Sequence, residues 1–540
     1  MDALKNFASK NFTEQVELLK DIEKKKDYAA IPELAELCKQ SDPFDQATFM
    51  AKNTLRSLLL ENEAYTLKGL MSDNLNLKKI SLQVCCRKKC PSATSILLTL
   101  FSSLISKQSS ELISGHLYYN EGFEILSALS LIQPPEALEI FRQYMHHKDS
   151  LIASLAIKTI GQYKDVESVD ALCKIVAKAE ADDRYEECEL TVAGAIDALA
   201  MINTDKAISF LASKIHHLNP VARRIIHAVF PRLGPETIHY IAPFLLDADT
   251  DVKIMAVNIL GAIGDKKGAE FIVEAVDKGI ADHPNVKFAV YEALGQMFSM
   301  KSLVHLTDGL FEPDPSILIA VVNSLNNQIN PGVTKKIKEI IGKDETHASR
   351  LINAIVASRA INLFESLYED ETIGNKMIEA ILKSNDKGLC GRFSEKLKAM
   401  KNKRAGSDAN KIKSISSGQS NKKILIVDDS KSMLAFYRTV ISAMQISVTA
   451  AENGQQAWDI LESDNSFNLI LTDLNMPVMT GIELTQKVRA NNSVDRIPIV
   501  IATTESEQSQ EQLAKKMGAN DFIIKPFSAN QLQNKINTLI

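Results

Sequence analysis

The sequence predicts a multidomain protein in which a long all-α repeat solenoid precedes an α/β domain built on a five-stranded parallel sheet. Apolar residues recur three and four positions apart through residues 1–395, which is the period of amphipathic helices. From residue 422 onward, short apolar runs alternate with helical patterns, the order typical of a parallel sheet covered on both faces. Residues 396–421 are rich in Lys, Ser, Gly and Asn, and we expect them to form a polar, basic linker.

A weak repeat with a step of roughly 30 to 40 residues runs through the helical part. Segments such as LAIKTIGQYKD, AIDALAMINTDKA, AVNILGAIGDKKGAEFIVEAV and AVYEALGQMFSMKSLVHL contain an apolar helix, a turn and the start of a second helix. Small residues that suit either a left-handed helix end or close helix packing fall near the ends of the first helices: Gly161, Ala200, Gly261 and Gly295. Such a unit buries its apolar face only against its neighbours, which favours a solenoid over the alternative, an irregular helical bundle.

These segments resemble HEAT repeats, and the stretch LGAIGDKKGAEFI does so most closely. The resemblance extends from about residue 149 to residue 339 and is weaker over residues 27–147, where NTLRSLLL and KKISLQVCCRKKC are candidate degenerate repeats. It implies a stacked α-solenoid whose long concave surface suits a protein partner.

Composition and charge argue against several classes of protein. Hydrophobic residues make up 45% and charged residues 24% of the chain, a globular balance, and the net charge of -5 gives no basis for binding nucleic acid or an acidic membrane. There is no secretory leader and no run of about 18 apolar residues, so no membrane span is expected. Seven cysteines in a chain of this length do not form a disulfide framework. We therefore expect a cytoplasmic protein with reduced thiols.

Charged and hydroxyl side chains stand at four strand ends of the predicted sheet. Asp428 and Asp429 follow KILIV, and Asp473 ends FNLILTD. Thr503 ends IPIVIAT, and Lys525 follows DFII. Ligands of open parallel sheets bind beyond the carboxyl ends of the strands, near the point where the strand order reverses. These five side chains are therefore expected to form one site.

The residue types in this site predict transfer of a phosphoryl group to a carboxylate. Three neighbouring carboxylates repel one another and favour a hard divalent cation with oxygen ligands, most readily Mg²⁺. The cation would neutralise charge as the group transfers in line. Asp473, on the central loop, is the best-placed nucleophile. Lys525 supplies a compact positive charge for the phosphoryl oxygens, and Thr503 can donate a hydrogen bond to one of them.

Residues 422–540 resemble the receiver domains of two-component response regulators, above all the chemotaxis type. The motifs that carry the resemblance are IVDDS, LTDLNMPVMTG and DFIIKPF. The resemblance implies a flavodoxin-like (βα)5 fold with Asp473 as the phosphoacceptor. It further implies that Mg²⁺ is held by Asp428, Asp429, Asp473 and the main-chain carbonyl of Asn475.

The same resemblance implies two conformational features. Thr503 and Phe522 are expected to form the switch pair, and the bond between Lys525 and Pro526 is expected to be cis. One residue departs from the family pattern: Thr504 stands where a smaller residue is often found, which would slow the access of a phosphodonor.

The whole chain is therefore predicted to be a response regulator of a two-component phosphorelay. Its receiver would accept a phosphoryl group from a sensor histidine kinase and control protein–protein interactions of the solenoid. No catalytic triad, P-loop or HExxH motif appears, so no enzymatic activity is expected beyond Mg²⁺-dependent self-phosphorylation and self-dephosphorylation. The alternative is a phospho-regulated nucleic-acid-binding protein using the solenoid, which requires a basic stripe along one face. The local candidates, KKIKEIIGK and VARRII, are offset by acidic residues, so nucleic acid is the less favoured partner.

Overall fold

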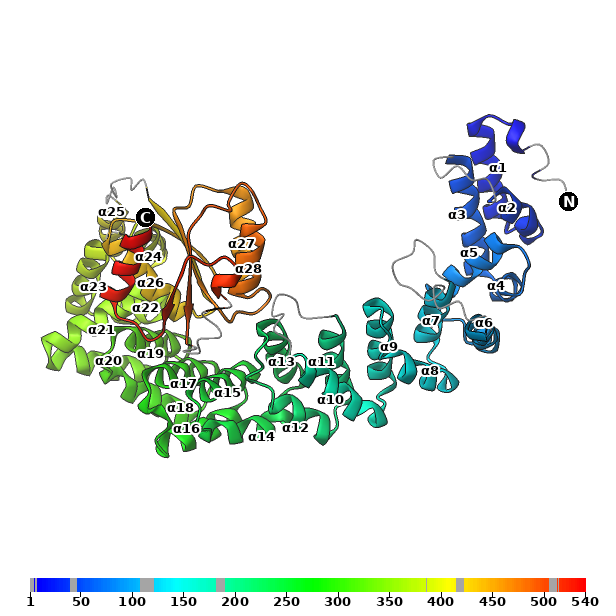
Figure 1. Ribbon diagram of the computed structural model, residues 1–540. Helices are drawn as coiled ribbons and strands as arrows, with labels where there is room; N and C mark the ends of the chain where they lie inside the picture. The colour runs from blue at the N-terminus through cyan, green and yellow to red at the C-terminus, as the bar shows by residue number, and fades with distance from the viewer. Residues whose placement is uncertain are drawn as a thin grey trace. The chain divides into compact units, whose positions relative to one another are not determined.

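The computed structural model describes residues 4, 7–38, 46–106, 121–180, 190–384, 386–413, 422–504, 512 and 514–540 (Figure 1). The chain divides into two compact units. The first comprises Met1–Lys178 with Glu189–Ala207, and the second comprises Ala179–Cys188 with Ile208–Ile540. The second unit contains both the later solenoid helices and the α/β domain.

The first unit is helical throughout its described part, apart from turns. Its helices are α1 (Phe12–Lys25), α2 (Ile31–Leu37), α3 (Gln46–Glu61), α4 (Glu63–Leu70), α5 (Leu75–Cys85), α6 (Thr94–Ser106), α7 (Glu121–Ile132), α8 (Leu138–Tyr144), α9 (Ser150–Tyr163), α10 (Val169–Lys178) and α11 (Leu190–Ile202). Every second helix contacts the next along the series α1, α3, α5, α7, α9 and α11. This stacking confirms the predicted solenoid over the irregular bundle.

The solenoid continues into the second unit. Its helices there are α13 (Pro220–Leu233), α14 (Ile238–Ile241), α15 (Thr250–Ile263), α16 (Lys266–Asp277), α17 (Pro284–Gln296), α18 (Met300–Asp308), α19 (Pro315–Asn327), α20 (Pro331–Lys343), α21 (Glu345–Ala357), α22 (Ile361–Tyr368), α23 (Glu371–Ser384), α24 (Lys387–Ala399) and α25 (Ala405–Lys413), with α12 (Asp205–Ala212) at the junction of the units. A capping side chain followed by Pro or Thr starts each of the helices α13, α15, α17 and α19. Successive contacts stack the helices α15, α17, α19 and α21 in that order.

The small residues near the helix ends serve close packing. A Cβ atom on Gly161 would lie 2.8 Å from Ala198 Cα in the next stacked helix, and one on Gly295 would lie 2.9 Å from Ser324 Cα. The left-handed positions come later, at Lys164 after α9 and at Gly264 after α15. Of the two roles that the sequence left open, close helix packing is therefore the correct one.

The predicted linker over residues 396–421 is wrong in its first part. Helix α24 continues to Ala399, and α25 covers Ala405–Lys413 and packs against α24. Ala405, Ala409 and Ile412 are buried on one side of α25, an apolar stripe too small to stand out in a polar segment. The rest of the predicted linker, residues 414–421, lies outside the described residues.

The α/β domain has five parallel strands in the order β2-β1-β3-β4-β5. The strands are β1 (Lys423–Val427), β2 (Ser447–Ala451), β3 (Leu469–Asp473), β4 (Ile499–Thr503) and β5 (Asp521–Ile524), and the described helices are α26 (Lys431–Ala443), α27 (Gly454–Ser463), α28 (Gly481–Arg489) and α30 (Ala529–Leu539). This order confirms the flavodoxin-like sheet and reverses between β1 and β3, where ligands of such sheets bind. The helix expected at about residues 506–517 lies largely outside the described residues.

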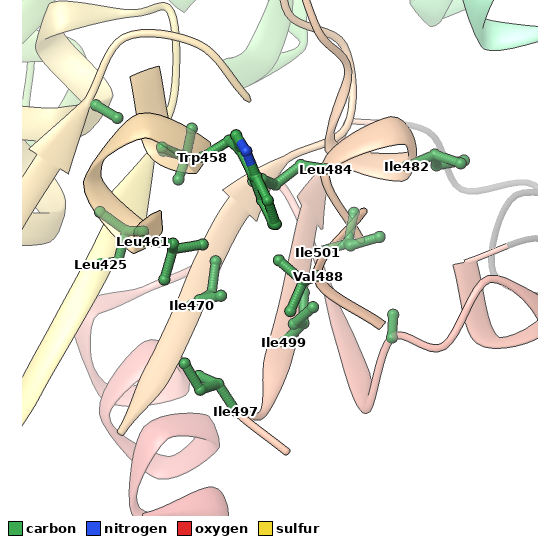
Figure 2. Packing of buried hydrophobic residues seen from close by; sticks show 14 of the residues in the cluster. Leu425, Trp458, Leu461, Ile470, Ile482, Leu484, Val488, Ile497, Ile499 and Ile501 are labelled. Carbon is green, nitrogen blue, oxygen red and sulfur yellow. The ribbon is translucent and has the colours of Figure 1, made fainter. Parts of the chain in front are cut away.

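The three central strands of this domain, β1, β3 and β4, are buried because helices cover both sides of the sheet. Figure 1 shows α27 and α28 on one side and α26 with the C-terminal helix on the other. Leu425, Ile470 and Ile499 of the strands pack against Trp458 of α27 and Val488 of α28 (Figure 2). This core holds the strand ends in fixed positions relative to one another.

Two further expectations concern thiols and membranes. Six cysteines of the described residues are free thiols, and four of them, Cys38, Cys85, Cys90 and Cys390, are buried. Burial raises the pKa of the Cys38 thiol to about 11, which makes it unreactive. Among the helices that the structure describes, none has the length and apolarity to cross a membrane.

We predict that Gly295→Ala destabilises the second unit by about 1–3 kcal/mol, because the new methyl group would force α17 away from α19. The matched control is Gly391→Ala in α24, where no atom lies within 4 Å of a built Cβ. That change should be neutral or stabilise by about 0.5–1 kcal/mol through helix propensity. Thermal unfolding of both variants checks this, and equal stability would contradict the packing role.

Candidate functional site

Two carboxylates and one lysine meet at the carboxyl edge of the sheet. Asp428 follows β1, Asp473 ends β3, and Lys525 follows β5. Lys525 Nζ lies 2.9 Å from Asp428 Oδ2 and 2.7 Å from Asp473 Oδ1. The ammonium group therefore joins three strand ends, as expected if these residues share one site.

Each of these side chains is held by further hydrogen bonds. Asp428 Oδ2 accepts from Tyr437 Oη at 3.2 Å, and Asp428 Oδ1 accepts from the backbone N–H of Ser430 at 2.9 Å. Asp473 Oδ2 accepts from the backbone N–H of Asn475 at 3.1 Å. The Lys525 N–H donates to the carbonyl of Thr503, and the Lys525–Pro526 bond is cis. The reactive groups are thus fixed by the backbone of the surrounding loops.

The remaining predicted residues occupy distinct positions. Asp429 is exposed next to Asp428, whereas Thr503 is buried at the end of β4. Phe522 is half-buried in β5, paired in register with Ile501, and Lys515 Nζ lies 5.6 Å from its ring centre. Phe522 therefore lies away from the acid site. Its strand, β5, is next to β4, which ends at Thr503.

The electrostatics of the site reflect buried negative charge. Burial raises the pKa of Asp473 to about 6, and Lys525 opposes this shift while Asp428 adds to it. Desolvation by the surrounding protein, and then the charges of Asp428 and Asp473, hold the pKa of Asp429 well above its usual range, although its side chain remains accessible from the cavity that it lines. Burial alone would lower the pKa of Lys525, but the two aspartates outweigh it and keep the lysine protonated. A site of this kind favours an additional cation.

The donor set fits Mg²⁺ without forming a closed cage. Within the described residues, no group of three acidic, His or Cys side chains is arranged as a ready metal site, and Lys525 lies between two of the carboxylates. Mg²⁺ usually keeps several waters and takes only one or two carboxylates together with phosphate oxygens. The exposed carboxylate of Asp429, beside Asp428, is chemically suited to this role.

Within the second unit, solenoid helices line the same site, which the sequence did not suggest. A cavity of about 510 Å³ is bounded by Asp428, Asp473 and Lys525 on one side and by residues of α13, α15, α17 and α19 on the other. Asn285 Nδ2 donates to the carbonyl of Lys525 at 2.7 Å, and Ser430 Oγ donates to Glu292 Oε1 at 2.7 Å. The site therefore opens into a chamber that the α/β domain and the solenoid helices line together.

Two further groups of contacts hold the α/β domain on these helices. Helix α26 packs on α19 and also contacts α21 and α23, and Asn323 Nδ2 donates to Ser432 Oγ at 3.2 Å. On the other side of the chamber, Arg223 donates to Asn475 Oδ1 at 2.9 Å, and Arg224 pairs with Glu483 at 3.2 Å. These partners are more than 100 residues apart in sequence, so no local pattern could have indicated them.

Comparisons with known proteins agree with both parts of the fold. Residues 424–537 match the response regulator receiver domain, and residues 123–191 and 240–326 match HEAT repeats. The chemotaxis protein CheY1 of Helicobacter pylori strain J99 is 37% identical over 119 residues, which cover 22% of this chain and 96% of that protein. The chemotaxis protein CheY of Pseudomonas aeruginosa is 37% identical over 118 residues, covering 22% and 94%.

Among solved structures, the chemotaxis protein CheY4 of Vibrio cholerae has 31% sequence identity and a TM-score of 0.21, covering 22% of this chain and 98% of that one. The receiver domain of the sensor histidine kinase PA1611 of P. aeruginosa, crystallised with a magnesium ion in its active-site cleft, has 27% identity and a TM-score of 0.21, with 22% and 98% covered. Both likenesses are confined to the C-terminal fifth of this chain.

We predict that Asn323→Arg detaches the α/β domain from the solenoid helices, because it places an unpaired guanidinium in the contact between α19 and α26. Amide exchange of α26 should become about tenfold faster, the factor that corresponds to 1.4 kcal/mol. Asn327→Arg is the control, since Asn327 is exposed at the end of the same helix. Equal exchange of α26 in both variants would show that this contact does not hold the domain.

Proposed function

The chain belongs to the response regulator receiver family through residues 424–537, and we propose that it is a response regulator in which phosphorylation of Asp473 controls the protein contacts of the HEAT-repeat solenoid. The observation that carries the proposal is the placement of Lys525 between Asp428 and Asp473 at the edge of the sheet. A sheet needs no such buried charges for stability, whereas phosphoryl transfer to a carboxylate uses all three.

The chemistry follows from these side chains. A carboxylate oxygen of Asp473 attacks phosphorus as the P–N bond of a phosphohistidine, or the P–O bond of a small phosphodonor, breaks. The bonding electrons leave with the donor, and Asp473 becomes an acyl phosphate. Lys525 neutralises charge on the phosphoryl oxygens, and the Thr503 hydroxyl donates to one of them. Mg²⁺, when held by Asp428, Asp429, Asp473 and the Asn475 carbonyl, supplies further charge neutralisation.

The proposed donor is a sensor histidine kinase, and hydrolysis of the acyl phosphate by water would reset the receiver. No other enzymatic activity is proposed. Protein partners of the solenoid are favoured over nucleic acid, because repeat surfaces suit proteins and the net charge is -5. The cytoplasmic location expected from the sequence stays a prediction.

Control of the solenoid is supported by the contacts around the acceptor loop. Asn475, two residues after Asp473, accepts a hydrogen bond from Arg223 of α13, and Lys525 accepts one from Asn285 of α17. A phosphoryl group on Asp473 would add negative charge and acceptor oxygens to a chamber that solenoid helices already line. The modification would therefore act directly at the contact between the two parts of this unit.

We predict that Asp473→Asn abolishes labelling by acetyl phosphate in the presence of Mg²⁺, because an amide cannot form the acyl phosphate. Asp459→Asn, at an exposed position on α27, should be labelled like the wild type. Phosphate incorporation followed by intact-mass analysis measures both, and circular dichroism checks that each variant is folded. Undiminished labelling of Asp473→Asn would place the acceptor elsewhere.

A second prediction concerns the proposed switch pair. Binding of beryllofluoride with Mg²⁺ should draw the Thr503 hydroxyl toward the acceptor and let Phe522 turn inward, a two-state change driven by local charge. Amide protection over residues 522–529 should therefore change in the wild type and stay constant in Thr503→Ala. A response that persists in Thr503→Ala would exclude this route.

A further inference from the structure

A fourth carboxylate approaches the acid site from the solenoid. Glu292 lies on α17, lines the chamber together with Asp428, Asp429 and Asp473, and accepts a hydrogen bond from Ser430 Oγ at 2.7 Å. Ser430 directly follows Asp429, and Glu292 lines the same chamber as the carboxylates that are proposed to hold Mg²⁺. The cation nearest to this group of acids, Lys525, already bridges Asp428 and Asp473.

Glu292 shares the positive charge of Lys525 with the aspartates of the site. Burial raises the pKa of this carboxyl, the hydroxyls of Ser430 and Ser432 oppose the shift, the charge of Asp428 adds to it, and the charge of Lys525 opposes it. A simple contact offers one explanation, because Ser430 caps the N-terminus of α26, where negative charge is favourable. That explanation leaves the charges of Glu292 and Asp429 beside Lys525, which Asp428 and Asp473 already engage.

We propose that Glu292 is a further ligand of the Mg²⁺ site, through its own oxygen or a bound water, so that the metal ion ties the receiver domain to the solenoid. This inference rests on the proposed function, which places Mg²⁺ at Asp428 and Asp429. A cation with several retained waters suits it, because Mg²⁺ accepts water-mediated carboxylates and needs no closed cage.

A measurable coupling follows from this arrangement. If Glu292 helps to hold the ion only while the domain is docked, then Mg²⁺ binds the docked form more tightly. By linkage, the ion shifts the population toward that form by the same factor. Couplings of this kind typically amount to about 5- to 150-fold.

The test titrates MgCl2 into the full chain by calorimetry for the wild type, Glu292→Gln and Glu270→Gln. Glutamine keeps the size of Glu292 and an oxygen for Ser430, while Glu270 is an exposed glutamate on α16 that serves as the control. We expect Glu292→Gln to weaken Mg²⁺ binding at least about fivefold and Glu270→Gln to leave it unchanged. Amide exchange of α26 should be slowed by Mg²⁺ in the wild type and not in Glu292→Gln.

Four other outcomes would overturn the inference in distinguishable ways. Equal or tighter Mg²⁺ binding by Glu292→Gln would show that the carboxylate of Glu292 does not contribute to the affinity for Mg²⁺ or lowers it. Faster exchange of α26 in Glu292→Gln, independent of Mg²⁺, would reduce the residue to a contact at the helix N-terminus. Binding that is lost in Asp429→Asn but kept in Glu292→Gln would leave the proposed function standing, whereas no Mg²⁺ binding by the wild type would contradict both.

Discussion

The site depends on the ion pairs that the ammonium group of Lys525 forms with two aspartates. It joins the ends of β1, β3 and β5 by bonding to Asp428 and Asp473, both of which are largely buried. Without it, carboxylates would face each other in a poorly solvated space and favour protonation over nucleophilic attack. The same contact keeps Lys525 charged, so the lysine and the two aspartates stabilise each other in their ionised forms, which the proposed phosphoryl transfer requires.

The position of this site against the solenoid helices is the structural basis of the proposed regulation. In most receiver-like folds the carboxyl edge of the sheet is where a ligand approaches. Here, solenoid helices within the same unit line that approach, through Asn285, Glu292 and Arg223. A negative charge added at Asp473 would therefore lie next to solenoid residues that already contact the α/β domain. The same holds for a cation bound beside Asp429. A long conformational path is not required for the two parts to be coupled.

The solenoid can present such a surface because its stacked helices approach one another closely. Gly161, Gly261 and Gly295 each leave no room for a side chain against the next helix of the stack. Because these glycines have no side chain, neighbouring helices can pack closely, and this close packing sets the spacing of the residues on those helices. Asn285 and Glu292 on α17 and Asn323 on α19 thus reach three different points on the α/β domain.

The sequence by itself determined the two-part fold, the order of elements in the α/β domain and the residues gathered at its sheet edge. These follow from local rules: helical and strand periods are written in neighbouring residues, and parallel strands bring their carboxyl ends to one edge. Helix α25 was not predicted from the sequence because its apolar stripe is short and lies in a polar segment. The stripe consists of Ala405, Ala409 and Ile412. Only the tertiary structure decided that Glu292, Asn285 and Arg223 reach the site, since each is separated by more than 100 residues from its partner. Contacts between residues so far apart in sequence depend on how many helices stack between them and on how closely those helices pack. Local sequence periodicity does not specify either quantity.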